Sequence, residues 1–379
     1  MRSEQLPNWL IRYLHGDEGD VEEIGDSRAH AGKTVLVTGA AGSIGAGLCE
    51  RLVLGGARKL ILLDICERNT FELQQKLHPL QSTRPTILKY VLGSICDAQL
   101  VAELFREHEI DNVFHAAACK HVPIAELNAV EAVRTNVFGT KLIAQAATDH
   151  DVSEFTLVST DKADLPCNVM GQSKRLAELL VQDLARNTSG TNFSIVRFGN
   201  VIGSSGSVVP IFRRQIREGR PITLTDPAMR RYFMTLNSAV AFLLGANQYG
   251  ASGDILAYDM GPQISIFALA QAVISAEISK SAALTSVEIQ TTGQRAGERL
   301  VEPNLVTSSS LPTRHPRIFL IEAANGAPRL SYSKLARISL AVSNRDDNLL
   351  RVHLEEIAKS GRSSSDLAQS KPVHTLKVA

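Results

Sequence analysis

The sequence lacks a charge bias, a long apolar run and a secretory leader, and each absence excludes a class of protein. Its 379 residues carry 40 basic and 39 acidic side chains, a formal net charge of +1. Neither nucleic acid nor an anionic membrane surface is therefore an expected partner. No stretch approaches the roughly 20 apolar residues that span a bilayer, and the polar start Met1-Arg2-Ser3 does not resemble a signal peptide. We expect a soluble, cytoplasmic protein.

Cysteine is also scarce. The cysteines are Cys49, Cys66, Cys96, Cys119 and Cys167. An odd number without paired spacing gives no sign of a disulfide scaffold or of a metal site. Free thiols in a reducing compartment fit this pattern best, and we expect no metal.

What the sequence does contain is a glycine-rich turn between a strand and a helix. The apolar run 35–37 ends in Thr38, glycines follow at Gly39, Gly42 and Gly45, and apolar residues then recur at helical spacing. Such a turn places main-chain N–H groups and a helix N-terminus where a pyrophosphate can bind. Alone, the pattern also fits a β–α turn that merely packs tightly. The residues expected to contact a dinucleotide here are Gly39, Ala41, Gly42, Ser43, Ile44 and Gly45.

An acid at the end of the next expected strand supports the dinucleotide interpretation. Asp64 follows the glycines by about 20 residues, where a carboxylate can accept hydrogen bonds from the adenosine ribose. Because it would repel a 2′-phosphate, Asp64 favours NAD over NADP, although Arg68 nearby weakens that preference. The small residues Ala116 and Ala117 suit either a backbone that passes close to the cofactor or ordinary helix packing.

Strands and helices alternate regularly from Thr34 to Gly199, and the rhythm then breaks. The alternation predicts an α/β fold with a Rossmann-type, doubly wound parallel sheet whose ligands lie at the carboxyl ends of the strands. The expected strands are 34–38, 59–64, 87–93, 112–115, 155–159 and 193–198, and a long helix is expected over 124–147.

This pattern divides the chain into four parts. They are an N-terminal extension or linker over 1–32, an NAD-binding Rossmann domain over 33–199, a mainly substrate-binding region over 200–335, and a C-terminal helix with a tail expected to be disordered over 336–379. The third part is discontinuous and could return an element to the sheet.

The loop after the fifth strand concentrates reactive groups. Thr160, Asp161 and Lys162 place a hydroxyl, a carboxylate and an ammonium at a strand end that should face the nicotinamide. Shortly afterwards, Met170 and Lys174 have the spacing of the Tyr-x-x-x-Lys pair of short-chain dehydrogenases, which puts both on one helix face. A thioether cannot exchange a proton, so the usual phenol is absent.

These residues belong to a longer set of motifs that carries a resemblance. The motifs are Thr38–Gly45, His115–Pro123, Thr135–Val137, Ser159–Ala163, Asn168–Gly171, Arg197–Val201, Gly206–Pro210, Arg231–Thr235 and Gly293–Glu298. As an ordered set they resemble the extended short-chain dehydrogenases that act as UDP-N-acetylglucosamine 4,6-dehydratases in bacterial polysaccharide biosynthesis. Cys119, Ser94 and Ala296 depart from the pattern without removing an expected catalytic group. Residues 1–32 are expected to be a remnant of the linker that follows the membrane-spanning half of longer relatives.

The resemblance implies a reaction and a role for each group of the loop. The cofactor takes a hydride from sugar C4, a base removes the C5 proton, water leaves from C6, and the hydride returns to C6. By family likeness Lys162 is the C5 base and Asp161 the acid for the leaving hydroxyl, although these two roles could be exchanged. Thr160 would hydrogen-bond at O4 and Lys174 would hold the nicotinamide ribose. A lowered pKa for Lys162, from burial and neighbouring Lys174, is expected.

The same resemblance implies where the UDP-sugar binds. Arginine suits a diphosphate because its planar fork can donate two parallel hydrogen bonds. Asn200 and the main chain at Ser207 and Val208 would bind sugar and diphosphate, and Glu298 the uridine ribose. The substrate-binding candidates are Lys120, Asn200, Ser207, Val208, Arg231, Arg295 and Glu298.

The sequence leaves two other functions open, and it also predicts an oligomer. A UDP-sugar 4-epimerase would keep the C4 chemistry, but epimerases of this fold normally retain the tyrosine that Met170 replaces. A non-catalytic NAD-binding sensor would be expected to lose the loop that this chain keeps. The helices near 124–147 and 170–187 are those that pair across a two-fold axis in this superfamily, so we expect at least a dimer.

Overall fold

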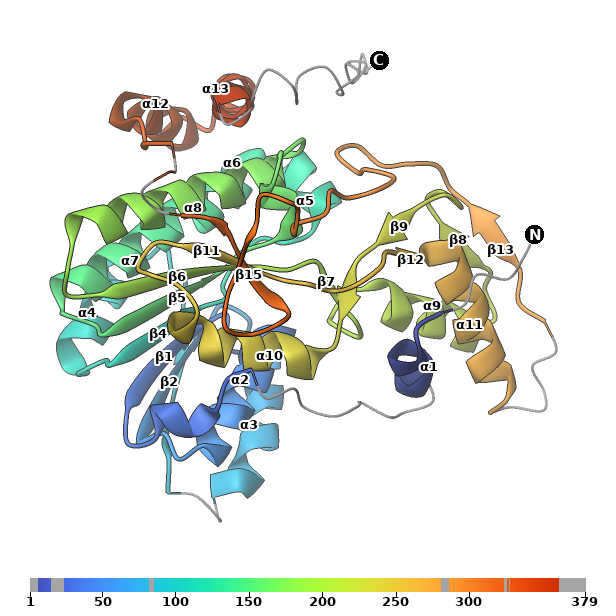
Figure 1. The fold of residues 1–379 in the computed structure, drawn as a ribbon, viewed down its shortest axis with the longest axis horizontal. Helices are drawn as coiled ribbons and strands as arrows, with labels where there is room; N and C mark the ends of the chain where they lie inside the picture. Colours follow the sequence, from blue (N-terminus) through green and yellow to red (C-terminus); the bar gives the residue numbers. More distant parts are fainter. Residues whose placement is uncertain are drawn as a thin grey trace.

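A nine-stranded sheet forms the centre of the molecule (Figure 1). The computed structural model describes residues 6–14, 24–81, 85–280, 286–323, 326 and 328–360. The strand order is β14-β15-β11-β6-β5-β4-β1-β2-β3. The strands are β1 Thr34–Thr38, β2 Lys59–Asp64, β3 Ile87–Leu92, β4 Asn112–His115, β5 Glu154–Val158, β6 Asn192–Arg197, β11 Ile255–Tyr258, β14 Leu311–Pro312 and β15 Ile318–Glu322.

The central strands are apolar because helices cover both faces of the sheet. All five residues of β1 are buried. Val35 and Val37 belong to one apolar cluster, and Leu36 between them belongs to the other. Alternate side chains of a strand point to opposite faces, so each face has its own core.

Two helix layers flank the sheet (Figure 1). One layer contains α2 Ser43–Leu54, α3 Glu67–Gln81 and α10 Leu236–Gly245, and the other contains α4 Ala98–Glu107, α7 Thr140–Asp149 and α8 Val169–Asn187. The strands from β3 to β11 run parallel, and β1 lies between β2 and β4. The predicted Rossmann-type fold is confirmed, with its switch point between β1 and β4.

The region after Gly199 is divided between the sheet and a smaller lobe. β11 pairs with β6, and β15 and β14 extend the sheet as antiparallel strands. The smaller lobe is built around its own apolar cluster, to which α1 contributes Leu10 and Leu14. Its elements are α1 Asn8–Leu14, α9 Val208–Arg217, α11 Ile266–Ile278, β7 Asn200–Val201, β8 Ile222–Leu224, β9 Arg230–Arg231, β10 Phe233–Met234, β12 Ile264–Ser265 and β13 Ile289–Thr291. Part of the N-terminal extension is thus built into this lobe.

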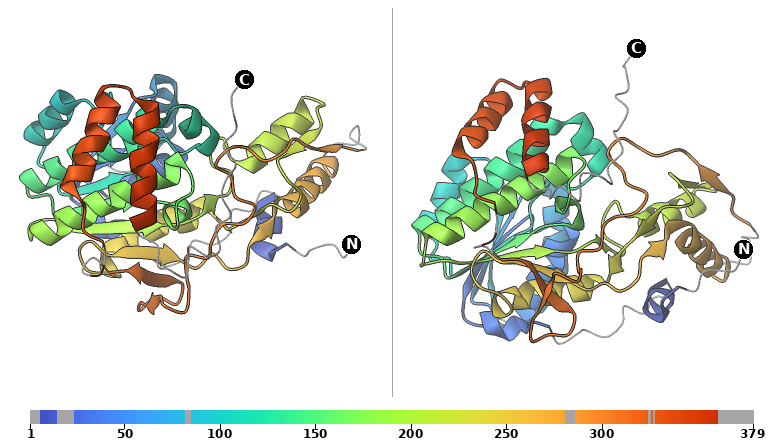
Figure 2. Two further views of the ribbon diagram at one scale, coloured as in Figure 1. Left: turned by 90° about the horizontal axis from the view of Figure 1, so that it is seen from above. Right: turned by 45° about the horizontal axis from the view of Figure 1, so that its top comes forward.

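A pair of C-terminal helices covers the outer side of one helix layer (Figure 2). They are α12 Tyr332–Ser343 and α13 Asp347–Ser360, and they pack on α8 and on α6 Ala129–Val133. Leu335, Ile338 and Leu354 are buried in that contact. The tail after residue 360 lies outside the described residues. Within the described part of the chain, no helix has both the length and the apolarity that crossing a bilayer requires.

The single helix expected over 124–147 is wrong. The structure has α5 Val122–Leu127 and α6, then a π-helical segment at Arg134–Gly139, and only then α7. Buried Asn136 lies in the π segment, where its amide bonds both the N–H and the carbonyl of Cys119. These contacts with a neighbouring loop compete with regular helix geometry, and π segments often occur at functional sites.

Candidate active site

A cavity of about 1010 Å³ lies at the carboxyl ends of the central strands, between the sheet and the smaller lobe. Its volume is at the upper end of the usual range for ligand sites. Cofactor candidates lining it are Gly39, Gly42, Ser43, Ile44, Gly45, Asp64, Ala116, Ala117 and Lys174. The cavity therefore collects residues that sequence motifs place far apart along the chain.

Two glycines of the first turn are required by the backbone itself. Gly39 has φ of +65°, and a Cβ there would lie 2.7 Å from the amide nitrogen of Ala117. A Cβ on Gly45 would lie 2.2 Å from the carbonyl oxygen of Gly39. The N-terminus of α2 has no side-chain cap, because Gly42 occupies the cap position. The main-chain N–H groups there fit a bound pyrophosphate.

Asp64 links the end of β2 to that turn. Its carboxylate accepts hydrogen bonds from the N–H of Ala41 and of Cys66, both at 2.9 Å. Ala41 itself does not line the cavity. Arg68 pairs with Glu72 at 3.1 Å on the protein surface. Asp64 thus faces the cavity, while the nearby base Arg68 is paired elsewhere.

The loop after β5 presents a hydroxyl and an amine to the cavity, but encloses the carboxylate between them. Thr160 and Lys162 line the cavity, whereas Asp161 is 0% exposed and does not. Asp161 Oδ1 accepts from Thr160 Oγ1 at 2.8 Å and from Lys162 Nζ at 2.9 Å. Its Oδ2 has no hydrogen-bond partner among the described residues. Asp161 thus holds its two neighbours and is itself enclosed behind the cavity wall.

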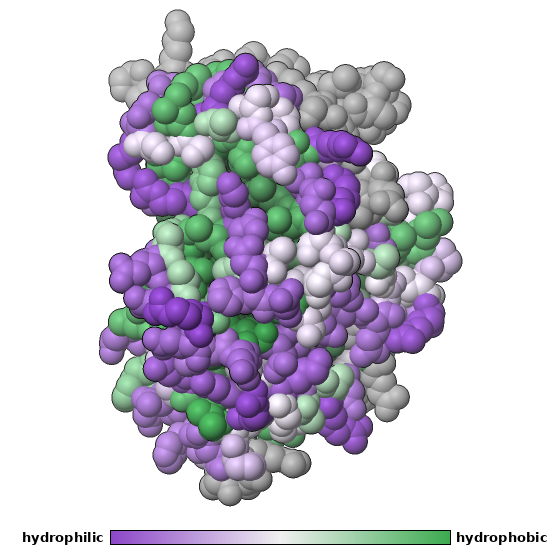
Figure 3. Space-filling view, turned by 90° about the vertical axis from the view of Figure 1, so that its left-hand side faces the viewer, coloured by the Kyte–Doolittle hydropathy of each residue, from purple (hydrophilic) through white to green (hydrophobic). Residues whose placement is uncertain are grey.

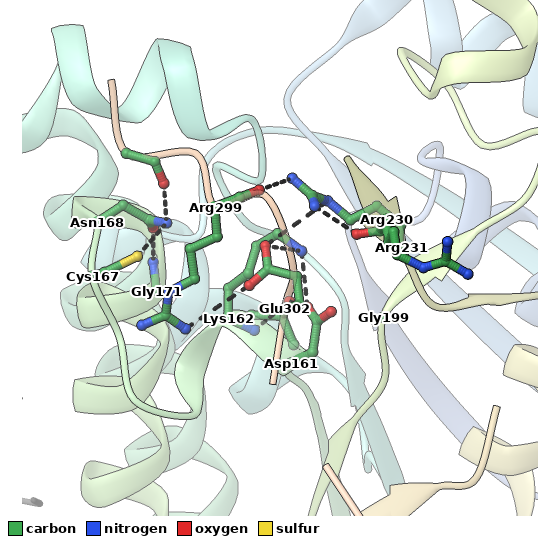
Figure 4. Close-up of polar contacts among 12 residues, drawn as sticks. Asp161, Lys162, Cys167, Asn168, Gly171, Gly199, Arg230, Arg231, Arg299 and Glu302 are labelled. Carbon is green, nitrogen blue, oxygen red and sulfur yellow. Dashed lines mark hydrogen bonds and ion pairs between the residues drawn. The ribbon is translucent and has the colours of Figure 1, made fainter. Parts of the chain in front are cut away.

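The expected lowering of the Lys162 pKa is wrong. Burial acts to lower the pKa of Lys162, but the Asp161 and Glu302 carboxylates outweigh burial and raise it. The Nζ atom lies 2.9 Å from Asp161 Oδ1 and 3.5 Å from Glu302 Oε1 (Figure 4). Lys162 is consequently an ammonium ion at neutral pH.

Lys174 has the lowered pKa instead. Burial lowers the pKa of Lys174 to about 8, and its Nζ donates to the carbonyl oxygen of Val158 at 2.6 Å. Met170, one turn earlier on α8, is 4% exposed and also lines the cavity. The Asn168 side chain caps the helix by accepting from the N–H of Gly171. A Cβ on Gly171 would lie 2.2 Å from the Lys162 carbonyl oxygen, so α8 packs directly on the reactive loop.

The smaller lobe supplies the other side of the cavity. Substrate candidates lining it are Lys120, Asn200, Ser207, Arg231, Arg295 and Glu298. Val208 does not line it and instead begins α9. Exposed Arg295 and half-buried Glu298 lie on one turn, where Glu298 accepts from the N–H of Arg295 at 3.2 Å.

Arg231 lines the cavity, and its guanidinium is bonded mainly to the main chain. Its guanidinium donates to the main-chain carbonyls of Arg230, Arg299 and Leu300 at 2.7 to 3.0 Å. Most of its donors therefore hold the 299–302 segment in place, with Nε 4.0 Å from Glu302.

Glu302 is the site residue that sequence reasoning missed. It is 4% exposed and lines the cavity, with the cations of Lys162, Arg231 and Arg299 at 3.5, 4.0 and 4.0 Å (Figure 4). It follows the Gly293–Glu298 motif in a segment without regular structure, so its position just after that motif was the only available signal.

A short loop of the smaller lobe closes over the glycine turn. The N–H of Ser205 donates to Ser43 Oγ at 2.9 Å, and Lys120 Nζ donates to the Ser205 carbonyl oxygen at 2.9 Å. Gly203 and Gly206 are the two ends of this loop, and both have φ of +72°. The strap, residues 203–206, thus connects the two sides of the cavity above the predicted pyrophosphate position.

Comparisons with known proteins agree on the family to which the chain belongs. The model of the family described as polysaccharide biosynthesis protein matches residues 35–323. The capsular polysaccharide biosynthesis protein CapD of Staphylococcus aureus is 41% identical over 276 residues, which are 73% of this chain but 45% of that protein. The chain thus spans about half the length of this relative. UDP-glucose 4-epimerase of Rickettsia rickettsii is 33% identical over 86% of this chain and 94% of its own.

A solved structure agrees with the sequence matches. Pen from Bacillus thuringiensis is 30% identical, has a TM-score of 0.71, and is matched over 83% of this chain and 98% of its own. The family model covers most of the strands of the sheet and the residues of both sides of the cavity. The chain belongs to the polysaccharide biosynthesis protein family of extended short-chain dehydrogenases.

Proposed function

We propose that this chain is a nucleotide-sugar 4,6-dehydratase of bacterial surface polysaccharide biosynthesis. Its substrate would be UDP-N-acetylglucosamine, and its product the 4-keto-6-deoxy UDP-sugar. The observation that carries the proposal is the loop after β5. Thr160 and Lys162 line the cavity there beside Lys174, while Met170 occupies the position of the usual tyrosine. Because a thioether cannot exchange protons, proton transfer depends on the loop.

NAD is the proposed cofactor, held by the glycine turn, Asp64 and Lys174. The uncapped N-terminus of α2 supports a cofactor with a pyrophosphate, while Asp64 at the cavity and the pairing of Arg68 with Glu72 favour NAD over NADP. When bound, the dinucleotide supplies reversible hydride transfer with the sugar. Since the hydride is borrowed and returned, denatured protein should release NAD and turnover should need no added oxidant. Stoichiometric accumulation of NADH would contradict this proposal.

The UDP moiety would lie against the smaller lobe. The N-terminus of α9, at Ser207 and Val208, offers main-chain donors to a diphosphate. The Oγ atom of Ser207 is buried and has no hydrogen-bond partner among the described residues. Arg295 is exposed beside the cavity and can add a fork of donors, while Glu298 can accept from the uridine ribose. Asn200 and Lys120 would bind the sugar and its phosphates.

The chain's own groups would then divide the proton transfers. Thr160 would hydrogen-bond at sugar O4 and pass its proton along the 2.8 Å contact to Asp161. Lys162 would act at C5, where the adjacent 4-keto group makes the C–H acidic. Lys174 would hold the nicotinamide ribose. The ammonium state of Lys162 requires that its resting proton first moves elsewhere.

A UDP-sugar 4-epimerase is the second candidate, favoured by the 33% identity to the Rickettsia epimerase over nearly its full length. Mass spectrometry and NMR of UDP-N-acetylglucosamine after incubation with the purified protein separate the candidates. A product lighter by one water supports the dehydratase. An isobaric galacto sugar would establish the epimerase, and unchanged substrate would favour a binding protein without catalysis.

A further inference from the structure

The carboxylate of Glu302 is held at the cavity by main-chain contacts. Arg231 bonds the carbonyls of Arg299 and Leu300, and the N–H of Arg230 donates to Leu300 at 2.9 Å. The Glu302 carbonyl itself accepts from Gln263 Nε2 at 2.7 Å. This part of the segment is therefore fixed against β9, and the Glu302 side chain projects from it toward Lys162 (Figure 4).

Lys162 lies between two carboxylates that differ in access. Asp161 is 0% exposed and does not line the cavity, whereas Glu302 does. Asp161 also accepts from Thr160, while the nearest cation to Glu302 is Lys162 Nζ at 3.5 Å. An acid that protonates a leaving hydroxyl must reach the substrate. Of the two, Glu302 is the carboxylate positioned to do so.

Because Lys162 is an ammonium ion at rest, a neighbouring group must accept its proton before Lys162 can act as a base. Both carboxylates raise the pKa of Lys162, so the resting side chain is an ammonium and has no lone pair to accept a proton. A base at C5 needs the free amine, and departure of the C6 hydroxyl needs an acid. One proton moved from Lys162 to a substrate-facing carboxylate would provide both.

We propose that Glu302 is a further catalytic residue of the dehydration proposed above, on which this inference rests. Glu302 accepts the resting proton of Lys162, and the freed amine takes the C5 proton. The C5–H electron pair forms the C5=C6 double bond while the C6–O bond breaks. The leaving oxygen keeps its bonding pair and takes the proton of Glu302, so water departs.

The remaining steps return every group to its starting state. After hydride return at C6, the Lys162 ammonium gives its proton to C5. The O4 proton, passed through Thr160 to Asp161, then restores the Lys162 ammonium across the 2.9 Å contact. Asp161 thus serves O4, Lys162 serves C5 and Glu302 serves O6.

Glu302→Gln keeps the shape of the side chain and removes its capacity to accept a proton. With UDP-N-acetylglucosamine in D₂O, we expect dehydration to fall by roughly 10²–10⁴-fold, the usual contribution of a positioned acid or base. Affinity for the UDP-sugar should stay within a few-fold. Deuterium exchange at C5 should be lost near neutral pH and return as pH rises, because solvent can then deprotonate Lys162, while dehydration stays slow.

Two further variants control for folding. Glu302→Asp keeps a carboxylate and should retain C5 exchange at a reduced rate, even if the glutamine variant unfolds. Glu322→Gln removes a carboxylate that is paired with Arg175 at 2.9 Å and does not line the cavity, and it should dehydrate at the wild-type rate.

Three other outcomes would overturn the role proposed for Glu302. Dehydration by Glu302→Gln within tenfold of wild type overturns the role of Glu302 alone. Loss of UDP-sugar binding together with activity also overturns it, since Glu302 would then be a binding group. Wild-type protein that forms the galacto epimer without C5 deuterium overturns the dehydratase, and this inference with it.

Discussion

Two of the lysines that line the cavity, Lys162 and Lys174, have pKa values that their surroundings shift in opposite directions. Lys162 has two carboxylates within 3.5 Å, which raise its pKa. Lys174 is similarly enclosed, but its Nζ bonds a neutral carbonyl, and burial lowers its pKa to about 8. The same residue type is therefore held as an ammonium ion in one place and is more easily neutralised in the other.

The low pKa of Lys174 predicts a pH-dependent cost to stability. Because the folded pKa lies below the unfolded value of 10.5, the cost is full below pH 8 and disappears as pH rises toward 10.5. At pH 7 it is on the order of 3 kcal/mol, partly offset by the bond to Val158. We expect Lys174→Met to unfold at a higher denaturant concentration than wild type at pH 7, with the difference shrinking by pH 10.

Urea titrations at both pH values measure this difference. Exposed Lys89 on β3 offers a control, since Lys89→Met should leave the midpoint unchanged at each pH. A constant advantage for Lys174→Met across the range would contradict the burial argument.

Met170 should be structural to the site, whereas Lys162 should be chemical. Met170 is 4% exposed and packs in the apolar cluster beneath α12 and α13. Met170→Leu keeps an apolar side chain of similar volume and should retain most activity. Lys162→Ala should lose roughly 10²–10⁴-fold in dehydration while still binding NAD and UDP-sugar. The opposite pattern, with an active Lys162→Ala and a dead Met170→Leu, would refute the assignment.

Sequence motifs identified many of the polar residues of the cavity but not their electrostatics. Gly39, Asp64 and Lys174 were predictable because each belongs to a short motif whose spacing encodes its position. Glu302 was missed because it reaches Lys162 across 140 residues of chain, in a segment fixed by contacts with Arg230, Arg231 and Gln263. The raised pKa of Lys162 depends on its neighbour Asp161 and also on the Glu302 contact, which the sequence did not indicate.

At the scale of elements, the strap joins two parts of the chain over the cofactor position. Ser43 begins α2, Lys120 follows β4, and both bond Ser205 in the smaller lobe. A cofactor that must stay through turnover benefits from such a closure.

Removing a strap contact should speed release of the dinucleotide. A hydrogen bond of this kind contributes about 0.5–1.5 kcal/mol, so Lys120→Ala or Ser43→Ala should raise the dissociation rate of NAD by roughly 2- to 10-fold per bond. Displacement of bound NAD by a labelled competitor measures the rate. Lys141→Ala, an exposed lysine on α7, is the control. An unchanged rate in both strap variants would show that the loop does not retain the cofactor.

The prediction of helices and strands failed where tertiary contacts decide the backbone geometry. Local periodicity predicted β1 to β6 well because buried strands and amphipathic helices repeat over short distances. The region 124–147 has a helical period throughout, yet the structure breaks it at Asn128 and widens it at Arg134–Gly139. Asn136 must satisfy polar groups of Cys119 and Ser173 at that point, and such tertiary contacts leave no local signature.

At the scale of the whole molecule, the C-terminal helices cover helices that we expected to pair two subunits. The helices expected to form a dimer include α6 and α8, and α12 and α13 of the same chain pack on both. On the face drawn in Figure 3, apolar surface gathers in the upper half and the lower half is mostly hydrophilic. An apolar helix face must pack against other apolar side chains, and here α12 and α13 of the same chain provide them.

Detaching α12 and α13 should expose the apolar face of α6 and α8 and cause the protein to self-associate. Ile338 on α12 is fully buried against the helix layer, so Ile338→Asp should cost roughly 3–5 kcal/mol of stability and raise the mass measured by light scattering at micromolar concentration. Leu340 lies two residues along the same helix but is 59% exposed, so Leu340→Asp should change neither quantity. Equal effects of the two substitutions would show that α12 is not a cover. A wild-type dimer whose mass is unaffected by Ile338→Asp would place the subunit interface away from α6 and α8, because the pairing surface would then be independent of whether α12 covers it.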